Sequence, residues 1–343
     1  MTKPKAGSSV CSVSETEYSF SDQKYKNSIN KKETTEMDIN RANLEALFSG
    51  FKSNFLTGFE QAPDTWQRFA APVQSGTASN VYPFLEQFGG MTEWNGERQV
   101  RNFTSQRIEI VNRDFEETVS VPRNDIEDDQ YGVYGTLVAE MGLHAAKLWQ
   151  DLAVEALLSN GNWIDDKAFF ATDRVYGESV ICNTCTGSLT AETYAAARKT
   201  MMSYRGHAGK SLGVIPDLLI VGPANEEAAF AILKDRMMLR SYNANGINGV
   251  GATDNPWNGS AELLVLPELS GTEYEDLWFL AATGGVLKPV FVQQRKMPVL
   301  TSLDRETDEN VFSRKEYVYG ADARGEAFLA FPHLIFKGGT AVE

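Results

Sequence analysis

The stretch Val121-Pro-Arg-Asn-Asp-Ile-Glu-Asp-Asp-Gln-Tyr-Gly132 leads directly into a long amphipathic segment and decides how the chain is interpreted. It contains no histidine or cysteine, and its acids lack the spacing that a catalytic or metal site requires. Carboxylates just before a helix lie near the positive end of the helix dipole, where each contributes about 0.3–1 kcal/mol. An acidic turn of this kind organises structure, which favours a building block over an enzyme. Its four carboxylates are Asp125, Glu127, Asp128 and Asp129.

The segment that follows has the strongest helical pattern in the chain. Its apolar residues recur at three- and four-residue steps, which predicts a helix over 134–159. Asn160-Gly161 provides a left-handed stop after it. At 1.5 Å per residue, such a helix is about 39 Å long. The residues of the stripe are Tyr134, Leu137, Val138, Met141, Ala145, Leu148, Leu152 and Ala156.

Length and composition limit the possible classes of protein. A chain of 343 residues can hold two compact domains or form one extended molecule with lobes. Its 42% apolar and 11% aromatic content predicts a folded protein. The formal charge of −14 argues against a direct grip on nucleic acid, which depends on Lys and Arg. An acidic surface would nevertheless suit a wall beside packed nucleic acid.

Cysteine usage and hydropathy indicate the compartment. Three cysteines, an odd number, give no disulfide framework and are typical of a reducing cytoplasm. The longest apolar run, Leu277 to Leu287, is interrupted by Thr283-Gly284-Gly285 and is shorter than the roughly 18–20 residues that span a bilayer. The N-terminus lacks the apolar core of a secretory signal, so Cys11 is not a lipidation site. These features predict a soluble, intracellular protein without a membrane partner.

The amino-acid composition of the N-terminal part of the chain changes at residue 37. Residues 1–36 are rich in Ser, Lys, Thr and Glu, which predicts a flexible extension. Within 37–75, apolar residues at helical spacing predict an amphipathic helix over 40–61. Gly50 and Gly58 weaken that helix, so we expect it to depend on packing against neighbours. Its apolar residues are Leu44, Leu47, Phe48, Phe51, Phe55 and Phe59.

The next fifty residues have extended character. Apolar and polar residues alternate within 76–124, for example where Phe115, Val119 and Val121 are separated by acids and hydroxyl residues. This alternation predicts a long β-ribbon with few core contacts of its own. Because an isolated ribbon is only marginally stable in water, it needs another surface to lie on.

The C-terminal half alternates helices and strands. A loop rich in Asn and Gly, 241–259, lies within it, and a loop of that length in a compact domain is usually functional or mobile. The expected helices cover 190–204, where Thr190 is the cap, and 225–235. The expected strands cover 217–221, 263–266, 277–281, 290–294, 316–319 and 327–331, with a charged turn at 304–310.

A possible zinc site is incomplete. Cys182-Asn-Thr-Cys185 has the spacing of half a site, but structural zinc requires four ligands. Two free thiols are therefore the expected state. The other candidate ligands are scattered singly along the chain, at Cys11, His144, His207 and His333.

Other chemical motifs also fail. Gly206-His-Ala-Gly-Lys-Ser211 is similar to a phosphate-binding loop, but Tyr204 stands where glycine is required, and the loop follows a helix instead of a strand. Calcium loops starting at Asp125 or Asp304 lack the glycine required at their sixth position. The three histidines show no nucleophile–base arrangement, and His144 in the long helix is more often packed or exposed than catalytic. We therefore expect no catalytic, cofactor-binding or metal-binding residues.

Several ordered motifs together resemble the major head subunits of phage Mu and Mu-like prophages. They are Glu93-Trp94-Asn-Gly96-Glu-Arg98, then Phe115 with Val119 and Val121, then Arg123-Asn-Asp125-Ile-Glu-Asp128-Asp129-Gln-Tyr131-Gly-Val-Tyr134. The same order continues through 209–216, 287–291, 294–296 and 312–324. The resemblance covers the chain from about Met37 onward. Residues 1–36 depart from it and are an added arm, a processed leader or a misplaced start.

The resemblance implies an α+β fold, the Hong Kong 97 type shared by the major capsid proteins of tailed phages and herpesviruses. Such subunits have an N-terminal arm, an extended β-ribbon loop over a neighbour, a peripheral domain with a long spine helix, and an axial domain at the capsomer centre. In this chain the implied division is an extension at 1–36, an arm at 37–75, a ribbon loop at 76–124, a peripheral domain at 125–189 plus 288–343 with its spine helix at 134–159, and an axial domain at 190–287.

The implied function is structural. The resemblance predicts a subunit that assembles with itself, as hexamers and pentamers, into an icosahedral shell around phage double-stranded DNA, without sequence-specific contact to that DNA. It also implies a scaffold, a maturation protease and a portal as partners, assembly in the bacterial cytoplasm, and residence in the virion. Two alternatives are a bacterial nanocompartment shell protein and an enzyme of unrecognised type. The candidate inter-subunit or structural residues are Glu93, Trp94, Gly96, Arg98, Arg123, Asp125, Asp128, Asp129 and Tyr131.

The sequence predicts a shell without covalent links between subunits. Some relatives join their subunits by lysine–asparagine isopeptide bonds whose lysine lies on the ribbon loop, but no lysine occurs between Lys52 and Lys147. Assembled protein should therefore run as a single monomer band on a denaturing gel. A ladder of cross-linked species would contradict this prediction.

Overall fold

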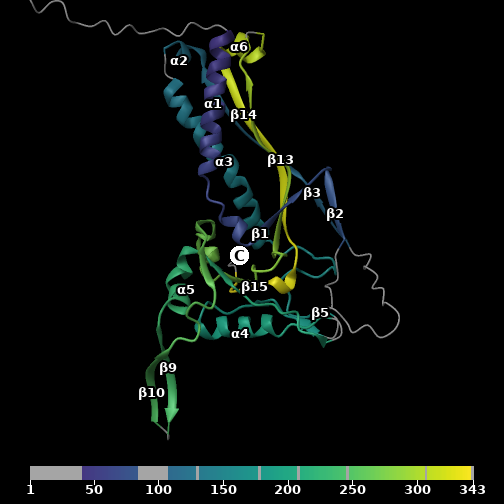
Figure 1. Ribbon diagram of the computed structural model, residues 1–343, viewed down its shortest axis with the longest axis vertical. Helices are drawn as coiled ribbons and strands as arrows, with labels where there is room; N and C mark the ends of the chain where they lie inside the picture. The colour runs from purple at the N-terminus through teal and green to yellow at the C-terminus, as the bar shows by residue number, and fades with distance from the viewer. Residues whose placement is uncertain are drawn as a thin grey trace, which may run out of the picture.

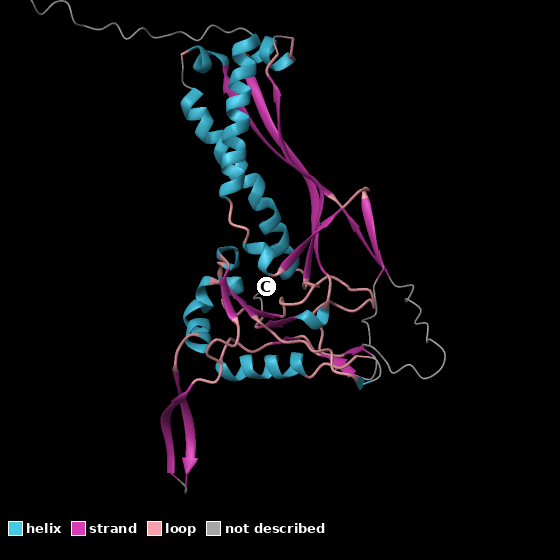
Figure 2. Cartoon of the chain, in the orientation of Figure 1, coloured by secondary structure: helices cyan, strands magenta, loops and turns pink. Residues whose placement is uncertain are grey.

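The computed structural model describes residues 41–83, 107–128, 131–176, 179–206, 209–244, 247–305 and 307–340. The predicted extension at 1–36 and the ribbon segment 84–106 lie outside these residues. The molecule is elongated, with a column of long helices and strands above an α/β unit (Figure 1). Three two-stranded ribbons stand apart from its two larger sheets (Figure 2).

The column combines helices with a four-stranded sheet of order β1-β13-β14-β4. β1 is parallel to β13, and the other neighbours are antiparallel. Its helical elements are α1 (Arg41–Gln61), η1 (Thr65–Arg68), α2 (Arg123–Glu127), α3 (Tyr131–Leu158) and α6 (Glu309–Arg314). Its strands are β1 (Ala70–Gln74), β4 (Arg113–Pro122), β13 (Val290–Leu303) and β14 (Glu316–Leu329).

The α/β unit is built on a five-stranded sheet of order β11-β8-β12-β15-β7. Its strands are β7 (Thr184–Cys185), β8 (Leu218–Val221), β11 (Glu262–Val265), β12 (Trp278–Ala281) and β15 (Ile335–Gly338). Its helical elements are α4 (Ala191–Met202), η3 (Pro223–Asn225), α5 (Glu226–Leu233), η4 (Pro267–Leu269), η5 (Thr272–Tyr274) and η6 (Pro332–Leu334). The sheet thus takes β7 and β15 from outside 190–287, the range expected for the axial domain.

The three ribbons are antiparallel pairs. They are β2 (Ser79–Pro83) with β3 (Arg107–Val111), β5 (Arg174–Tyr176) with β6 (Ser179–Ile181), and β9 (Met237–Ala244) with β10 (Ile247–Asp254).

The two helices predicted at 40–61 and 134–159 are confirmed as α1 and α3, and they pack closely. A Cβ atom on Gly58 would lie 1.7 Å from the carbonyl oxygen of Ala139, and one on Gly142 would lie 2.0 Å from that of Phe55. The absence of side chains at these two glycines therefore permits the contact. The apolar stripes of both helices then meet β14, where Phe51 packs edge-on against Tyr319 at 4.9 Å.

One long strand replaces two predicted short ones. The strands expected at 316–319 and 327–331 belong to a single strand, β14, in which alternate residues are buried. Gly325 lies inside this strand and permits close packing. A Cβ atom there would lie 2.6 Å from the ring of Trp149 on α3. Similarly, the strand expected at 290–294 extends to Leu303 through two register shifts.

Part of the acidic stretch is helical. Residues Arg123–Glu127 form α2, with Pro122 as the residue before its first turn. Proline fixes its own φ and suits a helix start, and Ile126 is fully buried in the core beside α1. Burial of this one apolar side chain accounts for the short helix that the charge pattern concealed.

In the C-terminal half, most predicted elements are confirmed. Thr190 caps α4 through a reciprocal capping box with Thr193, as the sequence indicates. The loop expected at 241–259 is partly wrong, because most of it pairs as the strands β9 and β10, while 255–259 are in no strand. In the sequence, Asn245-Gly246 lies between these strands, and this dipeptide is the strongest short-range signal for a hairpin.

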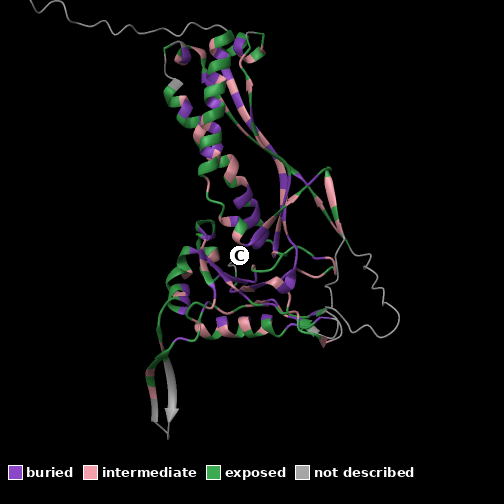
Figure 3. Cartoon of the chain, in the orientation of Figure 1, coloured by how far each residue is buried: buried purple, intermediate pink, exposed green. Residues whose placement is uncertain are grey.

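The ribbon predicted at 76–124 is only partly a ribbon. β2 and β3 pair with each other, whereas β4 joins the four-stranded sheet by pairing with β14 from Pro122 to Arg113. β4 therefore has core contacts that the alternation pattern did not reveal. The buried residues gather between α1, α3 and the long strands and within the α/β unit (Figure 3).

The column and the α/β unit are joined by polar contacts as well as by a shared core. Arg68 on η1 forms an ion pair of 2.7 Å with Glu262 on β11. The ammonium group of Lys288 donates to the carbonyl oxygens of Gln67 and Arg68, and burial lowers the pKa of this lysine. The core beneath these contacts includes residues from both units.

The glycine contact between α1 and α3 generates a stability prediction. Gly58→Ala should lower the free energy of unfolding by about 1–3 kcal/mol, because overpacking forces the two helices apart. The matched control is Gly50→Ala in the same helix, where an added Cβ meets nothing within 4 Å. That variant should gain about 0.5–1 kcal/mol from helix propensity. Denaturant unfolding measures both, and equal stability of the two variants would refute the close contact.

Candidate functional site

The described residues show no arrangement typical of catalysis or of metal binding. Among them, no group of three or more His, Cys, Asp or Glu residues could hold a metal ion. Cys182 and Cys185 are half-buried free thiols. In the same part of the chain, no helix combines the length and apolar character needed to cross a membrane.

The α/β unit has an open pocket of about 580 Å³ that is lined by few titratable side chains. Its titratable lining residues among those described are Asp217 and His333. The Asp217 carboxylate accepts bonds of 2.6 and 3.1 Å from the amide and hydroxyl of Thr283. Burial lowers the pKa of His333 to about 4, so its imidazole is neutral near pH 7. The remaining lining is largely apolar, including the exposed Val286, and so suits packing more than catalysis.

The predicted structural residues can be placed only in part. Glu93, Trp94, Gly96, Arg98 and Asp129 lie outside the described residues. Their proposed roles therefore remain predictions.

The remaining candidates belong to α2 and to the start of α3. Arg123 begins α2, and its backbone amide donates to the carbonyl of Lys315 at 2.9 Å. Asp125 accepts a hydrogen bond from the Tyr134 hydroxyl on α3, which raises the pKa of that phenol. Asp128 is the C-cap residue of α2, and Tyr131 is the first residue of α3. One acid of the stretch thus joins the two helices through a side chain.

The three ribbons carry the features that sequence reasoning missed. In β2–β3, Val81 and Val111 are 48% and 62% exposed. The strand register places both on one face, because Val81 pairs with Glu109 and Ser79 pairs with Val111. Tyr82 on the opposite face donates a 2.6 Å hydrogen bond to Gln293 of the sheet. One face of this ribbon is thus anchored, while the other presents Val81 and Val111 to solvent beside the hydrogen-bonded pair Ser79 and Glu109.

The other two ribbons repeat this arrangement. Val175 and Val180 of β5–β6 are direct cross-strand partners and are 72% and 57% exposed. On β9–β10, the register places Met237, Leu239 and Val250 on one face, with 56%, 75% and 64% of their surfaces exposed. Each ribbon therefore exposes two or three apolar side chains on one face, and exposed apolar residues that gather in one patch mark interaction sites.

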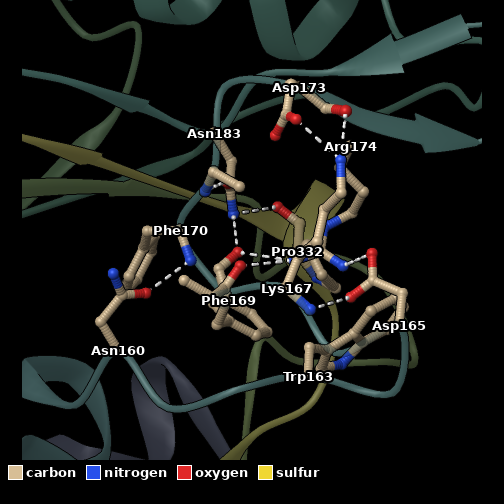
Figure 4. A network of polar contacts seen from close by, with 12 residues as sticks. Asn160, Trp163, Asp165, Lys167, Phe169, Phe170, Asp173, Arg174, Asn183 and Pro332 are labelled. Atoms are coloured by element: carbon tan, nitrogen blue, oxygen red, sulfur yellow. Dashed lines mark hydrogen bonds and ion pairs between the residues drawn. The ribbon is translucent and has the colours of Figure 1, made fainter.

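The base of β5–β6 is held by a buried cation (Figure 4). Arg174, only 1% exposed, forms an ion pair with Asp165, and its guanidinium lies 4.6 Å from the ring centre of Trp163. It also donates to the carbonyl oxygen of Ala168 at 2.6 Å. A buried charge paired on several sides fixes this base rigidly. In the sequence, Gly177 between Arg174-Val-Tyr176 and Ser179-Val-Ile181 would have signalled the hairpin.

Comparison with known proteins identifies relatives over nearly the whole chain. The sequence profile of the family described as "Mu-like prophage major head subunit gpT" matches residues 44–187, 176–269 and 268–342. The "Mu-like prophage FluMu major head subunit" of Haemophilus influenzae is 27% identical over 305 residues, covering 88% of this chain and 75% of that protein. The "Major capsid protein" of Escherichia phage Mu is 24% identical over 306 residues, covering 86% and 73%.

A solved structure agrees with these matches. A chain from the procapsid of bacteriophage JBD30 superimposes with a TM-score of 0.55 at 28% identity, covering 89% of this chain and 77% of that chain.

Proposed function

Because this chain belongs to the Mu-like prophage major head subunit family, we propose that many copies of it form the icosahedral shell around the double-stranded DNA of a phage. It is the major capsid subunit of a Mu-like phage, with the Hong Kong 97-type α+β fold. As a capsid component it belongs to the virion and associates with copies of itself. The matched relatives are phage head proteins, which favours this function over a nanocompartment shell or an enzyme.

The observation that carries this proposal is the exposed apolar face of each ribbon. A two-stranded ribbon has too little contact area to be stable alone and gains stability by lying on another surface. On the described residues, Val81, Val111, Val175, Val180 and Leu239 remain exposed. Neighbouring copies of the chain would cover them. Interfaces that are individually modest then add up, because each later contact forms inside an ordered lattice.

The expected domains fit this architecture with one adjustment. We assign the column to the peripheral domain, where α3 is the spine helix. We assign the five-stranded sheet to the axial domain, extended to include β7 and β15. On this assignment β9–β10, which projects beyond α5, would point toward the centre of a hexamer or pentamer (Figure 1). β2–β3 would begin the loop that lies over a neighbour.

The charge of the chain fits an inert container wall. With a net charge of −14, the subunit repels nucleic acid phosphates and does not bind them tightly. Packaged DNA would then contact the wall without sequence specificity. A scaffold, a maturation protease and a portal complete the proposed set of partners, with assembly in the host cytoplasm and no catalytic activity of the subunit itself.

Substitution on one ribbon tests the proposal directly. Val175→Asp should reduce particle yield at least tenfold, because it places a charge in a contact that must lose its water. The folded subunit should keep its melting temperature, since the side chain is 72% exposed. The matched control Val175→Ile keeps the surface apolar and should assemble normally.

Particle yield is measured after expression in bacteria, by sedimentation and negative-stain microscopy, and the melting temperature by calorimetry. If the unaltered chain forms no closed shells, or if Val175→Asp assembles as well as Val175→Ile, the proposed role of the ribbon faces is wrong.

A further inference from the structure

The bases of the three ribbons share one structural device. In each ribbon an asparagine follows the second strand by one or two residues: Asn112 after β3, Asn183 after β6 and Asn255 after β10. These residues are 5%, 0% and 7% exposed. Within the ranges that the structure describes, they are the only asparagines classed as buried. The chain therefore buries this polar residue at the places where a ribbon leaves the body.

Asn112 closes the base of β2–β3. Its amide nitrogen donates to the carbonyl oxygens of Thr77 and Ala78, at 2.9 and 3.1 Å, and to the hydroxyl of Ser75 at 3.1 Å. These residues come directly before β2, so the bonds tie the chain that leaves the ribbon to the chain that enters it. The amide oxygen of Asn112 accepts a 2.7 Å bond from Gln293, which is fully buried on β13. The base is thereby fixed to the four-stranded sheet.

Asn183 closes the base of β5–β6 in the same way. Its amide oxygen accepts a 2.9 Å bond from the backbone of Ala171, and its amide nitrogen donates to the carbonyl oxygen of Phe169 at 3.1 Å. Both partners precede β5. A second donated bond of 3.1 Å reaches the carbonyl oxygen of Pro332 in η6 (Figure 4). The side-chain amide of Asn183 thus joins the segment that enters the ribbon, the segment that leaves it and the body of the molecule.

Asn255 closes the base of β9–β10. Its amide nitrogen donates to the carbonyl oxygens of Ile232 and Asp235, at 2.8 and 2.9 Å. These carbonyls lie at the end of α5 and in the segment before β9, where a helix leaves its last carbonyls without helical partners. The backbone amide of Asn255 also donates to Arg236 at 3.0 Å. The ribbon is therefore tied to the helix from which it projects.

The hydrogen-bonding groups of asparagine explain why this residue type occupies the ribbon bases. Its short, uncharged side chain donates two hydrogen-bond protons and accepts at its oxygen, so one residue can join three backbone segments. Swinging the ribbon away would leave a buried amide and several carbonyls without partners, which is strongly unfavourable. The ribbon direction is thus set at its base, and in β2–β3 also by the bond from Tyr82 to Gln293.

We propose that Asn112, Asn183 and Asn255 are positioning residues for assembly, which hold each ribbon at a fixed angle to the body before any neighbour is present. This inference rests on the proposed function, because the fixed angle directs each apolar face onto a neighbouring copy of the chain. A ribbon that is already oriented loses less conformational freedom on docking, so contacts form more readily.

The first test measures ribbon direction in the unassembled subunit and does not depend on assembly. Spin labels are attached at Val81→Cys on β2 and Glu140→Cys on α3, with the three native cysteines replaced by serine. Pulsed electron paramagnetic resonance should give a single narrow distance distribution. Asn112→Asp, which removes the donated bonds at nearly constant shape, should broaden that distribution at least twofold. The matched control is Gln150→Glu, the same amide-to-acid change at a residue of α3 that is 5% exposed.

Two results of this first test would overturn the inference. One is a broad distribution in the subunit with an intact Asn112. The other is a distribution that Asn112→Asp and Gln150→Glu leave equally narrow. If Asn112→Asp does not fold, the neutral variant Asn112→Ser is measured in its place, with the same expected broadening.

The second test measures particles. Asn112→Asp and Asn255→Asp should each give at least tenfold fewer regular shells than the control variant Gln150→Glu. The comparison is made between variants whose melting temperatures are the same. Particles of unchanged number and diameter would overturn the inference. If the unaltered chain forms no shells at all, the proposed function fails, while the distance measurement still decides whether the asparagines fix the ribbons.

Discussion

The structure depends on one constraint: a two-stranded ribbon cannot cover both of its own faces. Each of the three ribbons has one apolar face that no described residue covers, and the exposed valines at 175 and 180 show this most simply. Water contact with such faces is unfavourable, and the chain has no further described element to lay over them. On the proposed function, neighbouring copies of the chain would cover these side chains and add to the stability that the ribbon bases already provide. This fold is consequently suited to a subunit that assembles with copies of itself.

The rest of the molecule supplies a rigid frame for these ribbons. The close contact at Gly58 and Gly142 locks α1 against α3, and the long strands β13 and β14 lie along the same column. Gln293 belongs to this sheet and also bonds Asn112, so the frame and the base of a ribbon share a residue. Rigidity of the frame matters because a small angular error at a ribbon base becomes a large displacement at its end. The buried asparagines extend this rigidity to the bases of the ribbons, where each ribbon leaves the body of the molecule.

Local patterns predicted the elements whose stability is local. The apolar stripes of α1 and α3 and the Thr190 cap of α4 were correctly predicted, because helical periodicity and capping are set by neighbouring residues. The continuity of β14 through Gly325 was not predicted, because the close approach of Trp149 to this glycine is a tertiary contact. The asparagine bases could not be predicted, because an isolated Asn looks like an ordinary turn residue until tertiary structure buries it. The motif around Trp94 contributed to the resemblance to the family through residue identity alone.

The most direct test of this account is hydrogen–deuterium exchange, compared between unassembled subunits and closed shells. We expect amides of β2–β3, β5–β6 and β9–β10 to become at least tenfold more protected in the shell. Amides of β8 and β12, which are already buried within one chain, should exchange equally in both states. Ribbon amides that exchange at the same rate before and after shell closure would show that neighbours do not cover these faces, and would contradict the account.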